Sequence, residues 1–356
     1  MACHGRQALV ISAGTMETVK KKGGKPEWME IISRYNKPDN LRSWWQIINS
    51  VVAYLVMWGL MIWSLNISYW LTLALTIPAA GFLVRTFIIF HDCGHGSFFR
   101  SKRLNTIIGV ISGLLVFTPY HSWHRDHHIH HQTVGNLEKR GIGDVMTLTV
   151  DEYQKKSRWQ RFVYRLYRNP LFLLGIAPLL LFVVQYRLPK KYMSVKEHVY
   201  LQLTNLALVL MVAAMVIIIG WKAYLMIQLP VLYIATVHGV WLFYVQHQYR
   251  HVKWSDSSTW DYKTMALDGS SFFKLPAVLN WFTGNIGYHH IHHLSPLIPN
   301  YKLKRCNDEN PLFGQVKPVT FWSAFHSLML RLWDEKRGML ISFREMRQGR
   351  EQVITG

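Results

Sequence analysis

Residues 69–95 have the sequence YWLTLALTIPAAGFLVRTFIIFHDCGH, an apolar run that ends in two histidines four residues apart. A helix needs about 20 apolar residues to cross the ~30 Å hydrocarbon layer of a membrane, and residues 69–90 meet that requirement. Three further stretches meet it as well: residues 44–63, 199–220 and 223–246. The sequence therefore predicts an all-α integral membrane protein, multi-pass, with four transmembrane helices.

The distribution of basic residues predicts the topology, because short cytosolic segments of membrane proteins are rich in Lys and Arg. The segment before the third predicted helix contains Arg187, Lys190, Lys191 and Lys196. The N-terminal segment contains Lys20, Lys21, Lys22 and Lys25. Only Trp221 and Lys222 separate the last two helices, which predicts a tight turn on the opposite face. Four crossings then bring residues 91 and 247 to the cytosolic face.

Two shorter apolar stretches, residues 104–120 and 171–186, contain Pro119 and Pro178 respectively. We expect both to lie in the membrane interface or to dip into the membrane without crossing it. The predicted organisation is a cytosolic N-terminal segment (residues 1–43), a membrane domain (residues 44–300) and a basic cytosolic C-terminal tail (residues 301–356).

Composition narrows the class of protein further. The chain has 40 Lys and Arg against 20 Asp and Glu, but no nucleic-acid recognition motif accompanies this charge, so we expect no nucleic-acid partner. Its three cysteines, Cys3, Cys93 and Cys306, are far apart and suggest no disulfide framework. In the tail, four apolar residues recur at helical spacing and predict an amphipathic helix: Phe321, Phe325, Leu328 and Leu332.

Most of the 18 histidines are gathered into short runs. Histidines separated by three or four residues lie on one face of a helix, where their imidazoles can reach one metal ion. Three runs have this spacing and supply His91 and His95, then His127, His130 and His131, and finally His289, His292 and His293. Neutral imidazole suits iron, zinc, copper or nickel. Eight ligands are too many for one ion, so we expect two metal ions.

These runs lie in longer motifs, namely HDCGHGSFF at residues 91–99, Trp123-x3-HxxHH followed by QTVGN, and HxxHH followed by LSPLIPNY. They resemble the three histidine boxes of the membrane fatty-acid desaturases, and the likeness extends over about residues 40–300. The resemblance implies a cytosolic, histidine-rich catalytic cap with a non-haem centre of two iron ions. It further implies O2-dependent formation of a double bond in an acyl chain of a membrane lipid.

The resemblance also bears on residues outside the three boxes. It makes the eight box histidines catalytic metal ligands, and His247 is expected as a ninth ligand because related desaturases recruit a histidine from this stretch. Acyl-CoA desaturases have an asparagine four residues before that histidine, whereas this chain has Phe243. No cytochrome b5-like domain is fused, so the expected electron donor is a separate ferredoxin or cytochrome b5. The expected location is a bacterial inner membrane, or an endoplasmic-reticulum or plastid membrane.

Other polar residues near the boxes receive supporting roles. His128 and His290 fall off the ligand face of their helices, and His121 and His124 share another face with His128. Four carboxylates are expected to orient imidazoles by accepting their second N–H: Asp92, Asp126, Asp144 and Asp268. Arg85 is expected to extend to the cytosolic interface, and His238 to pack against a polar neighbour within its helix.

Two other functions remain open at this point. A fatty-acid or carotenoid hydroxylase or ketolase would use the same scaffold, and only the product separates it from a desaturase. A non-enzymatic, histidine-rich metal transporter should place its ligands at the middle of the bilayer, whereas these clusters follow the ends of helices. The sequence specifies neither the position of the double bond, nor whether the acyl group is linked to a lipid or to CoA, nor the oligomeric state.

Overall fold

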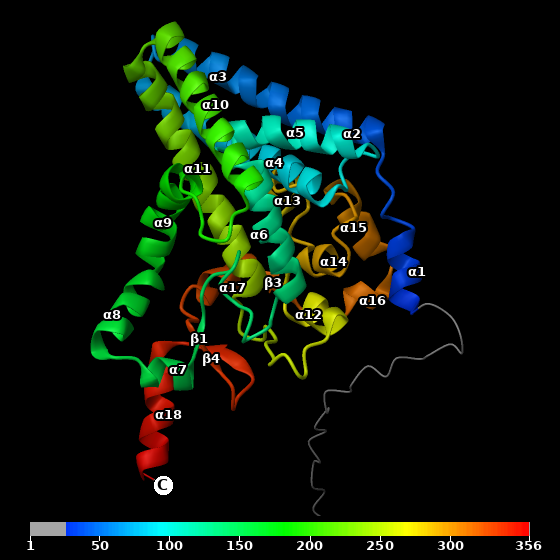
Figure 1. Cartoon of the computed structure of the whole chain (residues 1–356), viewed down its shortest axis with the longest axis vertical. Helices are drawn as coiled ribbons and strands as arrows, with labels where there is room; N and C mark the ends of the chain where they lie inside the picture. Colours follow the sequence, from blue (N-terminus) through cyan, green and yellow to red (C-terminus); the bar gives the residue numbers. More distant parts are fainter. Residues whose placement is uncertain (1–25, 356) are drawn as a thin grey trace, which may run out of the picture.

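The computed structural model describes residues 26–355. The N-terminal lysines and Cys3, which entered the topology and cysteine arguments above, lie outside this range. Four helices are long and apolar enough to cross a membrane, as predicted. The first is Asn40–Ser64, which consists of α2 (Asn40–Ile47), η1 (Ile48–Val52) and α3 (Ala53–Ser64). The other three are α4 (Tyr69–His95), α10 (Val195–Ile219) and α11 (Trp221–His247). Figure 1 shows them as the long rods of the molecule.

Helix α4 is central, since it packs against α3, α5 and α11. Small residues allow this close packing: Ala79 and Ala80 are buried where α4 meets its neighbours. Helix α10 differs, because Leu201 and Leu208 are its only buried residues. Its other faces expose leucine, valine and isoleucine, as expected of a helix that contacts lipid tails rather than water.

The two shorter apolar stretches form bent helix pairs, which raise the number of possible spans to six if each pair is one span. Helices α5 (Lys102–Leu115) and α6 (Tyr120–Thr133) meet at 103°, and α8 (Arg158–Tyr167) meets the segment 172–187 at 53°. That segment comprises η2 (Phe172–Ile176), α9 (Ala177–Leu179), η3 (Leu180–Val184) and η4 (Gln185–Arg187). The first bend follows from Phe117 in the left-handed region (φ 54°) and from Pro119, which precedes the first turn of α6.

Nine shorter helices complete the helical part of the described chain. They are α1 (Glu27–Ser33), α7 (Val150–Lys155), α12 (Tyr262–Asp268), α13 (Ala277–Phe282), α14 (His289–Leu294), α15 (Asn300–Asp308), α16 (Pro311–Gly314), α17 (Phe321–Ser327) and α18 (Phe343–Thr355). Figure 1 shows α12, α14, α15 and α16 grouped at one end of the bundle. The fold is therefore mostly helical, with a cap of short helices beside the long ones.

Five short strands depart from the all-α prediction. Strands β1 (Leu148–Thr149), β4 (Leu332–Asp334) and β5 (Met339–Ile341) form one sheet, and β2 (Phe272–Lys274) pairs in parallel with β3 (Pro318–Thr320). The amphipathic helix predicted through Leu332 is wrong in extent. Helix α17 ends at Ser327, and Leu332 pairs with Leu148 in β4, where it is fully buried.

Arg168 fixes the position of the segment that follows α8. Its side chain is 1% exposed, yet no carboxylate in the described part of the chain pairs with it. Its two terminal nitrogens donate instead to five neutral acceptors: the carbonyls of Met146 and Leu330, Thr147 Oγ1, Tyr244 Oη and Gln248 Oε1, at 2.8–3.0 Å. One side chain thus joins the strand region, the end of α11 and the C-terminal part.

We predict that Arg168→Ala destabilises the fold strongly, because it leaves several buried acceptors without a donor at about 1–3 kcal/mol each. A loss of roughly 3 kcal/mol would lower the midpoint of thermal unfolding in detergent by roughly 6 °C or more. The exposed Arg158 of the neighbouring helix supplies the control. Equal midpoints for Arg168→Ala and Arg158→Ala would contradict this account of the buried arginine.

Candidate metal centre and acyl cavity

The three histidine runs all lie on helices, as their spacing predicts. His91 and His95 occupy the last turn of α4, which ends because Gly96 adopts a left-handed conformation (φ 68°). The second run lies on α6 and the third on α14. His247 is the last residue of α11. Four helix segments that are distant in the sequence therefore present their histidines at one place.

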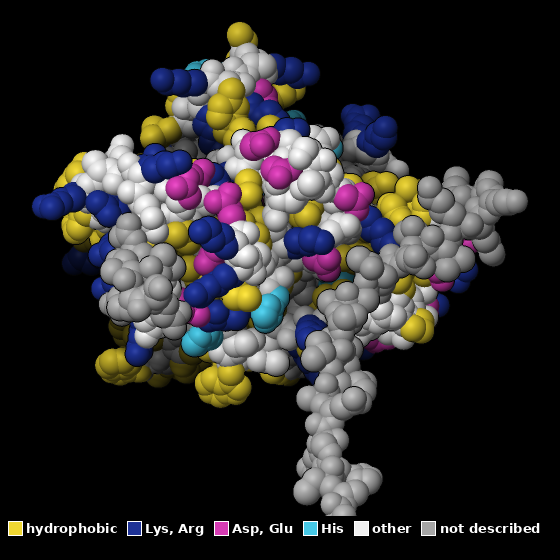
Figure 2. Space-filling model, turned by 90° about the horizontal axis from the view of Figure 1, so that it is seen from below, with side chains coloured by type: hydrophobic (Ala, Val, Ile, Leu, Met, Phe, Trp, Pro, Cys, Tyr) yellow, Lys and Arg dark blue, Asp and Glu magenta, His cyan; other side chains and the backbone are white. Residues whose placement is uncertain are grey.

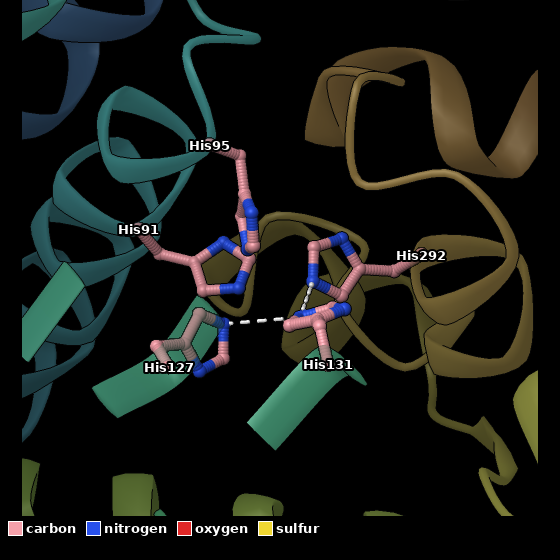
Figure 3. A group of neighbouring side chains, drawn as sticks. All are labelled: His91, His95, His127, His131 and His292. Carbon is pink, nitrogen blue, oxygen red and sulfur yellow. Dashed lines mark hydrogen bonds between the residues drawn. The ribbon is translucent and has the colours of Figure 1, made fainter. Parts of the chain in front are cut away.

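All nine predicted histidines fall into two clusters, each with one ring nitrogen per residue and with these nitrogens within 4.8 Å of one another. The five-histidine cluster consists of His91, His95, His127, His131 and His292. The four-histidine cluster consists of His130, His247, His289 and His293. Figure 3 shows the rings of the five-histidine cluster turned toward a common centre from α4, α6 and α14.

The two clusters adjoin each other. In the five-histidine cluster, His131 Nε2 lies 3.2 Å from His127 Nε2 and 3.1 Å from His292 Nε2. In the other, His247 Nε2 lies 3.1 Å from His130 Nε2 and 3.0 Å from His289 Nε2. The rings of His131 and His293 stack across the boundary with centroids 4.0 Å apart. The arrangement offers two neighbouring sets of convergent nitrogens.

The chemistry of these nitrogens fits a pair of metal ions. The Nε2 atoms of His91 and His95 are buried and have no hydrogen-bond partner in the described chain, although buried polar atoms normally have one. Burial lowers the pKa of His289, His292 and His293 well below the usual range, and neighbouring imidazoles lower it further. These rings are therefore neutral, which leaves a lone pair free for a metal.

Two of the four carboxylates contact imidazoles as predicted. Asp92 Oδ1 lies 3.0 Å from His91 Nδ1, and Asp144 Oδ1 lies 2.5 Å from His130 Nδ1. Both contacts fix the ring orientation and leave Nε2 directed into its cluster. The ring of His127 is held differently, because it stacks on Trp123 with centroids 4.3 Å apart.

The prediction for the other two carboxylates is wrong. The carboxylate of Asp126 accepts from Arg125 and forms an ion pair with Lys190. Asp268 contributes its backbone carbonyl to the Tyr249 hydroxyl, at 2.6 Å. His247 Nδ1 lies 3.2 Å from the carbonyl of Gly269, the residue after Asp268. The backbone carbonyl of Gly269, and not the carboxylate of Asp268, therefore contacts the imidazole of His247.

The remaining histidines lie outside the clusters. His128 is exposed and contacts Gln132, and His121 stacks on Tyr200 with centroids 4.0 Å apart. His124 is also exposed. His238 is exposed on α11, with Nδ1 2.8 Å from the carbonyl of Ile234, so its expected polar neighbour is the backbone of its own helix. His290 is fully buried, and burial lowers its pKa to about 3.

Arg85 does not extend to the membrane interface, so that prediction is wrong. Its side chain is buried, donates to the backbone carbonyl of Trp281 and lies over the Trp281 ring at 4.1 Å from the centroid. Helix α13, which is distant in the sequence, supplies this partner. Arg85 therefore ties α4 to the segment that leads into the third histidine run.

One supporting residue was missed entirely. The backbone N–H and side-chain amide of Asn300 donate to Asp92 Oδ2 at 2.7 and 2.9 Å, while Asp92 Oδ1 contacts His91. Gln46 in turn donates to Asn300 Oδ1 at 3.0 Å. The sequence signal was present in LSPLIPNY, whose asparagine is Asn300. This chain of contacts holds the first histidine box to the region after the third.

A cavity of about 690 Å³ lies beside both clusters, and His91, His127 and His289 form part of its wall. Such a volume is typical of a small-molecule site. Apolar side chains of α4, α11 and the segment 173–186 form most of the remaining wall, while Asp126, Lys190 and Tyr192 bring polar groups to it. The volume and the chemistry of the wall suit an apolar molecule with a polar end.

Comparison with known proteins agrees with this site. The sequence profile of the fatty acid desaturase family matches residues 67–324. The chain is 45% identical over 316 residues to the fatty acid desaturase of Bacillus subtilis, which covers 89% of this chain and 90% of that protein. It is 27% identical to the sn-1 acyl-lipid omega-3 desaturase (ferredoxin) of Synechocystis, over 67% of this chain and 68% of that protein.

A further relative is the sn-1 oleoyl-lipid 12-desaturase of Picosynechococcus, 26% identical over 75% of this chain and 76% of that protein. The family match and these relatives, together with four helices long and apolar enough to cross a membrane, define an oxidoreductase of the membrane desaturase class. The chain belongs to the fatty acid desaturase family.

We predict that Asp92→Asn weakens metal binding in the five-histidine cluster about 10- to 100-fold, because the amide is a poorer acceptor for His91 and Asn300. Titration of the purified protein with Fe²⁺ or Co²⁺, followed by absorption, measures the affinity. Asp126→Asn is the matched control, since Asp126 flanks a box histidine without contacting an imidazole. Equal affinities in the two variants would remove the proposed role of Asp92.

Proposed function

We propose that this protein is an O2-dependent desaturase that introduces a double bond into an acyl chain of a membrane lipid, with two iron ions and an external electron donor. The observation that carries the proposal is the position of histidines of both clusters in the wall of a mainly apolar cavity. Relatives whose names specify acyl-lipid substrates support the choice of lipid.

The nine histidines would hold one metal ion per cluster. Imidazole-only sites fit iron as well as zinc or copper, and the family favours iron because removing hydrogen from an unactivated chain requires redox chemistry. Two iron ions bound there would supply the activation of O2 and the removal of two hydrogens. Buried Asp92 and half-buried Asp144 keep the rings of His91 and His130 in place.

The cavity would bind and orient the acyl chain. Burying each methylene contributes about 0.8 kcal/mol, so an apolar wall holds the chain without specific polar contacts. Leu83, Val84 and Phe87 of α4 precede His91 on the same wall and would exclude water around the reacting carbons. The polar groups of Lys190 and Tyr192 would face the ester end of the lipid.

We further propose that the clusters face the cytosol. The basic linker that carries Lys190, Lys191 and Lys196 precedes α10, and Lys190 pairs with Asp126 beside the second box. Positive residues favour the cytosolic side, so this contact supports the same side for the metal centre. A transporter is not favoured, because His95 and His247 end their helices instead of lying at mid-span.

Expression in a host without polyunsaturated lipids tests the activity. We expect new double bonds at one defined position, located by mass spectrometry of the extracted lipids, and none in cells with the empty vector. Hydroxylated or keto products instead would identify a sister oxygenase on the same scaffold. No new product in iron-replete, aerated cells containing the membrane-inserted protein would count against a desaturase.

Alanine at each of the nine clustered histidines should abolish the product, because each removal opens a metal coordination position. The residues are His91, His95, His127, His130, His131, His247, His289, His292 and His293. Product per membrane-inserted protein is the measurement. The exposed His128 supplies the control, and His128→Ala should retain most activity because it lies outside the clusters. His290→Ala should also be milder than the clustered variants, although it removes a fully buried side chain. Substantial activity in any clustered variant would remove that residue from the ligand set.

The electron donor should dock on the cytosolic face by a weakly steered encounter. Figure 2 shows Lys and Arg side chains on the lower end of the molecule with Asp and Glu side chains between them. Ion pairs in the described part of the chain include Arg250 with Glu345 and Arg305 with Glu309. Electrostatic steering spans roughly 10- to 1,000-fold in association rate, and we expect the lower value because much of the charge is neutralised locally.

Stopped-flow reduction by ferredoxin or cytochrome b5 across a salt series measures this effect. Raising the ionic strength shortens the Debye length to about 8 Å at physiological salt, so the second-order rate should fall by about tenfold. A rate that does not change with salt would contradict electrostatic steering of the donor. The positive charge would then serve only to set the orientation of the protein in the membrane.

A further inference from the structure

One face of α11 forms a continuous wall of the cavity. Leu232, Ala235, Thr236, Gly239, Phe243 and Gln246 all line it. These positions recur at intervals of three and four residues, so they form a single stripe along the helix. At ~1.5 Å per residue the stripe from Leu232 to Gln246 is about 21 Å long. The wall therefore runs from Gln246, the neighbour of His247, to the middle of α11.

Gly239 lies in the middle of this stripe and leaves a gap in the wall. A Cβ atom built on Gly239 meets no other heavy atom within 4 Å. Two other helical glycines are closely packed: a Cβ on Gly81 would lie 2.7 Å from the Phe282 ring, and one on Gly109 would overlap Tyr120. Close packing explains those two glycines and does not explain Gly239.

Glycine at this position is costly for the helix itself. Gly in a helix interior is less favourable than Ala by roughly 0.5–1 kcal/mol. Gly239 has no left-handed backbone conformation that would require it, since it is not among the glycines with positive φ. Because a larger side chain at this point would project into the cavity, the feature that the glycine preserves is open space.

The chemistry of the cavity orients its ligand. The charged groups Asp126 and Lys190 and the Tyr192 hydroxyl lie on α6 and the linker after η4, whereas the α11 stripe adds only the neutral polar side chains of Thr236 and Gln246. Leu232 and Ala235 lie toward the middle of α11, away from its histidine end. A lipid acyl chain therefore enters with its ester end near Lys190 and extends its methyl end along α11. Gly239 then faces the chain about 12 Å along the helix from His247.

We propose that the gap at Gly239 accommodates the methyl-terminal part of the acyl chain beyond the metal centre and thereby sets the longest chain that the enzyme desaturates. This inference rests on the proposed desaturase function. It assigns the selectivity for chain length to Gly239 on α11, where the lack of a side chain leaves room for the substrate.

The test is a size series at this position, Gly239→Ala, Gly239→Val and Gly239→Leu, in cells supplied with fatty acids of graded chain length. Mass spectrometry gives the ratio of desaturated long chains to desaturated short chains. Gly59→Leu is the matched control, because Gly59 lies on the membrane helix α3, has the same open surroundings and does not line the cavity.

We expect the ratio to fall stepwise with the size of the side chain, by at least about tenfold for Gly239→Leu, while Gly59→Leu leaves it unchanged. An unchanged ratio in all three Gly239 variants would overturn the inference. So would equal loss of products of every length in all three variants with metal content retained, because Gly239 would then act on the reaction and not on chain length. Absence of products from the wild-type protein would instead contradict the desaturase function itself.

Discussion

The fold depends on nine imidazoles, eight of them buried and that of His95 half-buried, which meet in two adjoining clusters. A buried polar nitrogen without a partner costs free energy, and the described chain leaves several of these nitrogens without one. Positive charges on neighbouring rings would repel one another, and burial together with this repulsion lowers the pKa of His289, His292 and His293. Metal ions bound in the two clusters would satisfy both constraints at once. The clusters also bring together the ends of α4 and α11, helix α6 and the short helix α14, which links the membrane bundle to the cap.

The surrounding residues hold this centre in place from several sides. Asn300 connects Asp92 to Gln46, so that α15 and α2 support the first histidine box. Arg85 connects α4 to α13. Arg168 connects the end of α11 to the segment that forms one wall of the cavity. These contacts join segments that are far apart in the sequence, and they fix the metal centre relative to the space beside it.

Local periodicity was sufficient to predict the spans and the three histidine runs, whereas His247 was expected only from the family resemblance. Length and apolarity define the four long helices, and Trp123 sets the register of the second box, where its ring stacks on His127. Features that depend on distant partners were not predictable. The carboxylate of Asp126 faces Arg125 and Lys190 instead of an imidazole, and Leu332 forms a strand because β1 is available to pair with it. The cavity was not predictable either, because α11, including Gly239, and the segment 173–186 form its wall together.

The central claim is that each cluster binds one iron ion. Crystals of the iron-loaded protein, measured on both sides of the iron absorption edge, test it most directly through anomalous difference maps. The account predicts two iron peaks per chain, one among His91, His95, His127, His131 and His292 and the other among His130, His247, His289 and His293. A single peak, or peaks that follow the zinc edge instead of the iron edge, would contradict it.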